Sequence, residues 1–523
     1  MPLALLVTMA PAAPLAAAAF GFARPGRRPA GLSTFAQGLA LAAFASALIA
    51  AAALVVGGPA DGPLVGVGGF GLRARLDAVS AIMLLLVTFI GFVVVRYSAT
   101  YLDGEAREGT FMGWLCLTLA AVTMLVTAAN LLQLVLAWIA TSLFLHRLLL
   151  FYGDRVEARR AARKKFVTAR LGDVALVGAA ALLAAAYGTS DIAAIAAAAR
   201  ASDGGSYAVA AAFLLAIAAM LKSAQFPTHG WLIEVMETPT PVSALLHAGV
   251  VNAGGFLLVR FADVMLLAPN ALALVAMVGG FTALFGGLVM LTQSTVKTSL
   301  AWSTVAQMGF MLLECGLALF PLALLHIVAH SLYKAHSFLA SGGAVERVAA
   351  IRRPGPVAIP SVADVGRAFL AALVLYAAVA WSFGFIAHKS PQAIALGAIL
   401  IFGVAYMLAQ GFADAAPAAL TRTTAVYAVA TSVSYFVLQT LAVRLTAAAL
   451  PPSPPPGARE WALIALTTAG FGLVAIAQAL LPLWSRHPAA AGLRVHLANG
   501  FYANAVFDQL VGGWSLAPGS RNP

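Results

Sequence analysis

Three ionisable side chains lie at four-residue intervals in one apolar stretch of the chain. His326, His330 and Lys334 occur in LLHIVAHSLYKAHSFLASGG, and this spacing predicts that they share one helix face, about 6 Å apart along its axis. Histidine exchanges protons near neutral pH, so such a ladder suits hydrogen-bonded water and a proton relay. A metal site formed by the two histidines is the alternative, but it lacks a third ligand at a suitable spacing.

A second polar group lies in the segment MLKSAQFPTHGWLIEVMETPTPVSALLHAG. Lys222 ends an apolar stretch, and Pro227 follows five residues later. Because proline lacks an N–H and clashes with the carbonyl four residues earlier, this order predicts a helix break between residues 223 and 227. The alternative is that Lys222 only extends its ammonium group to the membrane surface.

Further ionisable residues flank these two groups. Pro241 suits the first turn of a new helix, which places His247 about two turns inside that helix, with Glu237 just before it. Lys297 precedes AWSTVAQMGF at an expected helix start, and Asp173 in ARLGDVALVG lies within an apolar span, where it could pair with a nearby lysine or arginine. We expect these side chains to belong to one polar pathway, with Lys297 either part of it or at the membrane interface.

The composition explains why these ionisable side chains are candidates for function. Of the 523 residues, 62% are hydrophobic and only 10% are charged, and the mean hydropathy is +0.93. Soluble domains carry about a quarter of charged residues, so a water-soluble globule of this size is excluded. We predict an all-α, polytopic membrane protein with about 14 to 15 transmembrane helices and a broken helix near Lys222. Ionisable residues inside hydrocarbon are costly, which makes them functional candidates.

The cysteines and the N-terminal segment exclude some kinds of site and of targeting sequence. Cys116 and Cys315 lie in separate apolar runs, so they indicate neither a disulfide framework nor a CxxC metal site. The apolar N-terminus has no basic residue ahead of it, so we interpret residues 2–22 as a retained first helix rather than a signal peptide.

Basic residues predict the orientation of the helices. With the N-terminus outside, the loops on the cytoplasmic side contain most of the basic residues. These residues are Arg24, Arg27, Arg28, Arg155, Arg159, Arg160, Arg163, Lys164, Lys165, Arg347, Arg352, Arg353 and Arg486. We interpret the run GDRVEARRAARKKF (153–166) as a cytoplasmic loop rather than a nucleic-acid patch. The prediction is a multi-pass protein of the cell inner membrane with its C-terminus in the cytoplasm.

Two long motifs now identify a resemblance. The segments KSAQFPTHGWLIEVMETPTPVSALLHA and KTSLAWSTVAQMGFMLL, followed by LHIVAHSLYKAHSFLASG, resemble the proton-antiporter module shared by antiporter-like subunits of complex I and Mrp antiporters. The similarity covers roughly residues 75–345. Within that superfamily the chain resembles the DabB family, on the segment AWIATSLFLHRLLLFYGDRVEARRAARKKFVTARLGD and on the lack of a long lateral C-terminal helix.

The resemblance implies a role for each matching position. Lys222 matches the central switching base, and Lys297 matches the lysine before the AxST motif. The positions that continue the hydrated path are His247, His326, His330 and Lys334. Two departures stand out: Trp138 is followed by Ile139 where the family has a glutamate, and the exit-half lysine motif is absent after residue 350, where Lys389 is the only candidate.

The resemblance also implies parts and partners. The parts are N-terminal transmembrane helices (1–76), an antiporter-like module (77–345), C-terminal transmembrane helices (346–484) and a cytoplasmic tail (485–523). The implied protein is not an enzyme; it conducts cations, H⁺ or Na⁺, and has no cofactor of its own. Its implied partner is a peripheral zinc subunit of the DabA type that hydrates CO₂ to bicarbonate. The alternatives are a proton-pumping subunit of a complex I or membrane hydrogenase type complex, and a passive scaffold.

Overall fold

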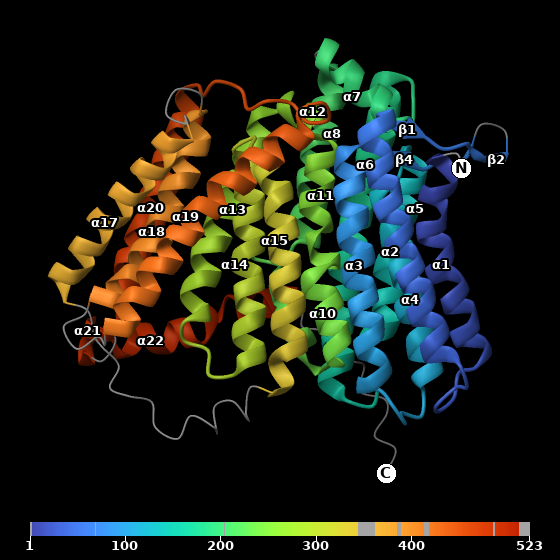
Figure 1. Ribbon diagram of the computed structural model, residues 1–523, viewed down its shortest axis with the longest axis horizontal. Helices are drawn as coiled ribbons and strands as arrows, with labels where there is room; N and C mark the ends of the chain where they lie inside the picture. Colours follow the sequence, from blue (N-terminus) through green and yellow to red (C-terminus); the bar gives the residue numbers. More distant parts are fainter. Residues whose placement is uncertain are drawn as a thin grey trace.

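The protein is a bundle of long helices that stand side by side (Figure 1). A computed structural model describes residues 3–67, 70–202, 204–343, 361–383, 389–412, 418–484 and 487–511. Within these ranges, 12 helices are long and apolar enough to cross a membrane. Three more, α1, α14 and α15, have 21, 21 and 20 residues and stand in the same bundle (Figure 1). The predicted all-α membrane class is therefore confirmed.

Long apolar stretches form the long helices, and short polar segments connect them. The first group of long helices is α1 (Leu3–Ala23), α2 (Leu32–Gly57), α3 (Ala78–Tyr101), α4 (Glu108–Val126), α5 (Leu131–Leu149), α6 (Val156–Tyr187) and α8 (Gly205–Lys222). The second group is α13 (Pro269–Met290), α14 (Val296–Gly316), α15 (Phe320–Leu339), α17 (Val362–Ser382), α18 (Pro391–Phe412), α19 (Ala418–Thr446) and α20 (Ala458–Ala479). Figure 1 shows α19 running obliquely across the bundle, from the side of α17 and α18 toward α12 (Ala262–Leu266).

Short elements mark the two ends of the bundle. At one end, β1 (Ala60–Asp61) pairs with β4 (Arg75–Leu76), and β2 (Val65–Val67) pairs with β3 (Phe70–Leu72), both antiparallel. We call this the hairpin end, and α7 (Ile192–Ala201) lies there too (Figure 1). At the opposite end, α21 (Leu481–Trp484), α22 (Ala491–Ala498) and α23 (Ala503–Leu510) follow α20. We call residues 488–511 the C-terminal strap, and this end the strap end.

The helix break predicted near Lys222 is confirmed, and a second break adjoins it. α8 ends at Lys222, and the chain resumes helix only at α9 (Gly230–Glu234) and then at α10 (Thr240–Ala248), which has Pro241 in its first turn. The sequence predicts one new helix that begins near Pro241. Instead it is interrupted at residues 249–252, where Gly249 leaves helical geometry, before α11 (Ala253–Arg260) continues it.

The two breaks lie against each other. The Ser223 hydroxyl, just past the end of α8, donates to the carbonyl of Val251 at 2.8 Å. The backbones can approach because Gly254 has no side chain: a Cβ there would overlap Ser223 Oγ and the carbonyl of Ala219. Each break exposes backbone groups that helix bonds no longer satisfy, and this packing keeps them inside protein rather than in lipid.

The basic run 153–166 is not the loop predicted from sequence. From Val156 onward it forms the first turns of α6, which is 32 residues long. Lys164 and Lys165 are buried, and the positive-inside argument therefore counted two interior side chains as loop charges. The run has the low hydropathy of a loop, but α6 extends beyond an apolar span and packs against α8 and α9.

The C-terminal strap crosses the lower end of α13 and α14 in Figure 1 and reaches α6. Lys164 Nζ lies 2.9 Å from Glu234 Oε1 and 2.6 Å from Asp508 Oδ1, and it also contacts Asn504. Arg160 adds an ion pair to Asp508 at 3.2 Å. Residues 488–511 were predicted as part of a tail; in the structure they pack against the bundle.

We predict that Asp508→Ala loosens the C-terminal strap. The change removes a carboxylate from a buried lysine, and an interaction with a charged group contributes about 1.5–3 kcal/mol. Proteolytic release of a C-terminal tag from the purified protein should become about tenfold faster or more, because the strap opens more often. Asp154→Ala, at an exposed position, is the control and should leave the rate unchanged. Equal rates for both variants would contradict the role of this ion pair.

Candidate ion path

Lys222 lies beneath an aromatic ring in the interior. Its side chain is buried, with 8% of its surface exposed, and Nζ lies 4.3 Å from the centre of the Trp138 ring on α5. Asp173 on α6 interacts electrostatically with it. Asp173 also pairs with Arg170, one turn earlier, at 2.6 Å, which agrees with the expectation that this acid finds a basic partner. The ammonium group of Lys222 is therefore enclosed by protein and does not extend to a surface.

Lys165 is a fourth charged member of this group, and the sequence reasoning missed it. Its Nζ donates to the Ser142 carbonyl at 2.7 Å and to the Ser142 hydroxyl at 3.0 Å. It interacts electrostatically with Lys222 and with Asp173. Three basic side chains thus share one carboxylate, on α6 rather than at position 139 of α5. The signal that could have found Lys165 is its seven-residue spacing from Gly172, which places it on the buried face of α6.

The histidine ladder lies on α15 as predicted. The rings of His326 and His330 are 6.0 Å apart. His330 Nε2 lies 3.1 Å from the carbonyl oxygen of His247, so α15 is tied to α10 at the second helix break. Lys334 donates to the carbonyl of Leu300 at 2.9 Å and contacts the Ser303 hydroxyl, and its charge also acts on His247. The structure therefore brings His247, His330 and Lys334 together.

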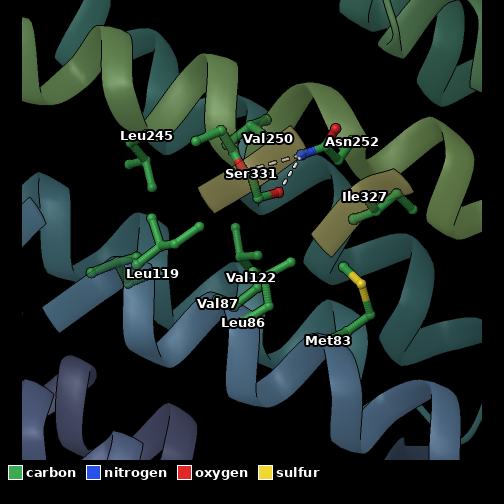
Figure 2. A pocket seen from close by; sticks show the side chains of 13 residues that line it. Met83, Leu86, Val87, Leu119, Val122, Leu245, Val250, Asn252, Ile327 and Ser331 are labelled. Carbon is green, nitrogen blue, oxygen red and sulfur yellow. Dashed lines mark hydrogen bonds between the residues drawn. The ribbon is translucent and has the colours of Figure 1, made fainter. Parts of the chain in front are cut away.

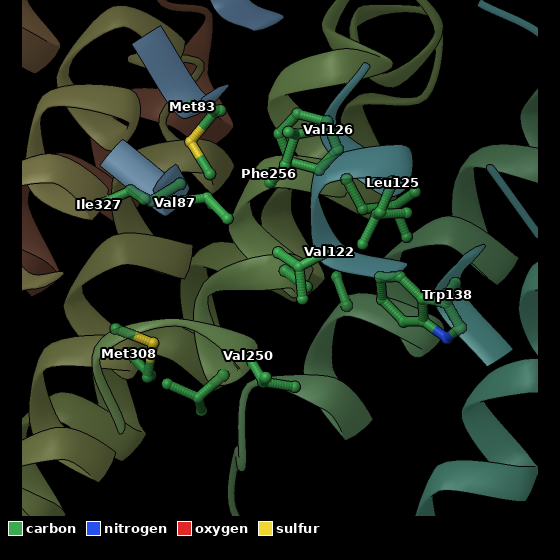
Figure 3. Packing of buried hydrophobic residues seen from close by; sticks show 14 of the residues in the cluster. Met83, Val87, Val122, Leu125, Val126, Trp138, Val250, Phe256, Met308 and Ile327 are labelled. Carbon is green, nitrogen blue, oxygen red and sulfur yellow. The ribbon is translucent and has the colours of Figure 1, made fainter. Parts of the chain in front are cut away.

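Apolar side chains separate the Lys222 group from the ladder. Figure 3 shows Val122 and Leu125 of α4 beside Trp138, with Val250, Met308 and Ile327 farther toward α14 and α15. All of them belong to one continuous core cluster. This stretch offers few groups that could hold a proton.

One polar position interrupts this apolar stretch. Figure 2 shows Asn252 donating to the Ser331 hydroxyl, at 2.8 Å, on the wall of a cavity of about 20 Å³. A cavity of about 10–15 Å³ or more can hold one water molecule where polar partners are present. The side-chain oxygen of Asn252, Oδ1, is buried and has no hydrogen-bond partner.

The last interior group is an acid that the sequence reasoning did not single out. Glu314, near the end of α14, is 4% exposed, and its Oε2 lies 3.1 Å from His326 Nδ1. Its isolated position in the apolar run MLLECG was the available signal. It extends the ladder by one group toward the hairpin end, because α14 ends there at Gly316.

The remaining predicted positions lie apart from this axis or outside the described side chains. Lys297 is in the first turn of α14, half-buried, about 17 residues from Glu314 and toward the strap end. The side chain of Glu237 is outside the described part of the structure. Within the described ranges, His, Cys, Asp and Glu side chains form no group of three that could hold a metal ion.

Comparison with known proteins shows which families this chain resembles. Residues 128–353 match the family described as NADH:quinone oxidoreductase/Mrp antiporter, TM, and residues 67–112 match the complex I chain 5 N-terminus. The chain is 44% identical over 342 residues to the probable inorganic carbon transporter subunit DabB2 of Halothiobacillus neapolitanus. It is 47% identical over 296 residues to the corresponding subunit DabB of Hydrogenovibrio crunogenus.

Coverage and fold complete the comparison. The alignments cover 65% and 55% of this chain, and the chain spans 62% and 56% of the length of these two relatives. The structure of the Mrp complex from Dietzia sp. is similar with a TM-score of 0.65 at 23% identity, over 97% of this chain and 59% of that one. The chain is therefore similar to the antiporter-like membrane proteins of the complex I and Mrp type over residues 67–112 and 128–353, and it is similar to the DabB inorganic carbon transporter subunits over 55–65% of its length.

Proposed function

We propose that this chain is the ion-conducting subunit of an inorganic carbon accumulation complex. The observation that supports it is a buried set of ionisable side chains that runs from α6 and α8 through α10 to α15 and α14. A passive anchor has no need for such groups, because each charge at the centre of a membrane costs about 2.5–3.5 kcal/mol. The similarity to DabB subunits supports the choice of complex.

Ion movement begins at Lys222 in this proposal. A proton reaches the group formed by Lys222, Lys165 and Asp173, and a proton gained by one member changes the electric field at the others. The proton then passes by water near Asn252 to the ladder of His247, Lys334, His330 and His326. Each ladder histidine accepts a proton at one ring nitrogen and releases one from the other. One charge moving through 100 mV supplies about 2.3 kcal/mol.

The proposed use of this energy lies on a second protein. A peripheral zinc subunit of the DabA type would hydrate CO₂ to bicarbonate, and the ion flow would make hydration effectively one-way. The zinc chemistry is assigned to that partner, and we propose no cofactor for this chain. The strap end would face the cytoplasm of a cell with this protein in its inner membrane, consistent with basic residues such as Arg155 and Arg160 near that end.

The competing function is proton pumping in a complex I or membrane hydrogenase type complex. A tagged copy purified from its native membrane distinguishes the two functions. Our proposal expects a single large zinc-containing protein to copurify in stoichiometric amount. Copurification of iron–sulfur or quinone-reducing subunits instead would favour the competing function.

We predict that Lys222→Ala and Lys222→Arg both abolish ion-driven bicarbonate accumulation. Alanine removes the proton-exchanging group, and arginine keeps the charge but does not release its proton in proteins. Both variants should assemble normally, judged by the amount of copurifying partner. Radiolabelled inorganic carbon uptake by cells is the measurement. Full uptake with Lys222→Arg would show that a fixed charge suffices and would contradict the switching role.

We predict that His330→Gln slows uptake by about tenfold or more while the metal content of this chain stays at zero. Glutamine can hold the bond to the His247 carbonyl, but it cannot carry a proton. Metal analysis of the isolated chain, after separation from the zinc partner, tests the alternative. Stoichiometric metal in the original chain that disappears in His330→Gln would establish a metal site instead of a relay.

A further inference from the structure

We propose that Glu314 is the exit carboxylate of the ion path and that it delivers protons to a hydrated cavity leading toward Lys389 at the hairpin end. This proposal rests on the proposed function, since it concerns the route by which the same ions leave. It offers an exit group in place of the family's exit-half lysine motif, which is absent after residue 350 of this sequence. The argument uses the Glu314–His326 pair, the cavity beside it, and Tyr435 with its neighbours.

Glu314 and His326 form a buried acid–base pair at the end of the ladder. Their 3.1 Å separation lies within hydrogen-bond distance, and the other ring nitrogen of His326, Nε2, is buried without a hydrogen-bond partner. An isolated acid in hydrocarbon is costly, whereas an acid beside a proton-exchanging ring can accept the proton that the ring releases. The pair is therefore arranged for transfer from His326 to Glu314.

Both members of the pair line a large cavity. Its volume is about 850 Å³, and it lies between α13, α14 and α15 on one side and α18, α19 and α20 on the other. Polar side chains from five of these helices line it, among them Gln307, Glu314, His326, Tyr406, Tyr435 and Gln478. Such groups give water several partners along the wall, so the cavity can hold a connected water chain rather than a single molecule.

Tyr435 links this cavity to Lys389. Its hydroxyl is buried without a hydrogen-bond partner, and it interacts electrostatically with Glu314. Lys389 Nζ lies 5.4 Å from the centre of the Tyr435 ring, 4.4 Å from that of Phe436, and donates to Gln439 at 2.7 Å. Lys389 precedes α18, whose first residues lie at the hairpin end, so this side chain marks where the cavity approaches that end.

The transfer steps balance without any further reactant. Protonated His326 gives its Nδ1 proton to the Glu314 carboxylate, which leaves a neutral ring and a neutral acid. The acid then gives the proton to cavity water and returns to the carboxylate. The neutral His326 ring keeps its Nε2 proton, so it turns about the Cβ–Cγ bond to face its free Nδ1 toward the ladder, and it takes the next proton there. Tyr435 can hydrogen-bond to that water and orient it, and the positive charge of Lys389 discourages the proton from returning.

Flux measurements test the exit role. In proteoliposomes containing the whole complex, with no Na⁺ present, Glu314→Gln should lower proton flux about tenfold or more, and Glu314→Asp should restore part of it. The double variant Glu314→Gln, His326→Gln should be no slower than Glu314→Gln alone, because the two residues act as a unit. Normal flux in Glu314→Gln while Lys222→Ala abolishes it would overturn the exit role and leave the proposed function standing. Normal flux in both would overturn both.

Thiol labelling tests the cavity without relying on flux. A charged methanethiosulfonate reagent reacts only with a thiolate in contact with water, and the native Cys116 and Cys315 are buried. Gln478→Cys, on the cavity wall of α20, should be labelled at least tenfold faster than Leu473→Cys, on the same helix at a 69% exposed position away from the cavity. Equal or slower labelling at position 478 would mean that lipid fills the cavity, and would overturn the proposed route.

Discussion

The cost of a charge in hydrocarbon governs the arrangement of this bundle. Three interior ionisable groups of the candidate path have a compensating neighbour: Lys222 has Trp138 and Asp173, Lys334 has the Leu300 carbonyl, and Glu314 has His326. These neighbours come from different helices, so the helices can dock in only a few ways that leave each charge compensated. The polar path is thus also what holds the helices in register, and the apolar surface around it supplies the remaining packing.

Broken helices make this compensation possible at the centre of the bundle. An unbroken helix uses all of its backbone groups internally and can offer only side chains. The interruption at residues 249–252 frees carbonyls, and the carbonyls of His247 and Val251 accept from His330 and Ser223. Small residues such as Gly254 allow the backbone next to the interruption to lie close to α8. The same arrangement can change with modest backbone movement.

Sequence reasoning reached the features whose signals are local. The length of the apolar stretches predicts an all-α membrane protein, and Pro227 predicts the first helix break. The four-residue spacing predicts that His326, His330 and Lys334 share one face of α15. It missed features that depend on where distant segments meet. The interruption at Gly249 lies in a run without proline, Lys165 reads as a loop residue until α6 is seen to extend, and Glu314 becomes meaningful only beside His326. Contacts between different helices, such as that of Glu314 on α14 with His326 on α15, leave no periodic trace in the sequence of either helix.

The C-terminal strap has a consequence for how the chain is made. Asn504 meets Lys164 across 340 residues, so the interior lysine of α6 waits for its final partners until almost all of the described chain has left the ribosome. During synthesis Glu234 is the nearest of these partners to arrive, 70 residues after the lysine. A chain that stops short of the strap would leave this ammonium group with Glu234 but without Asn504 and Asp508. The strap end would then open more often than in the finished protein, because fewer buried contacts hold it closed.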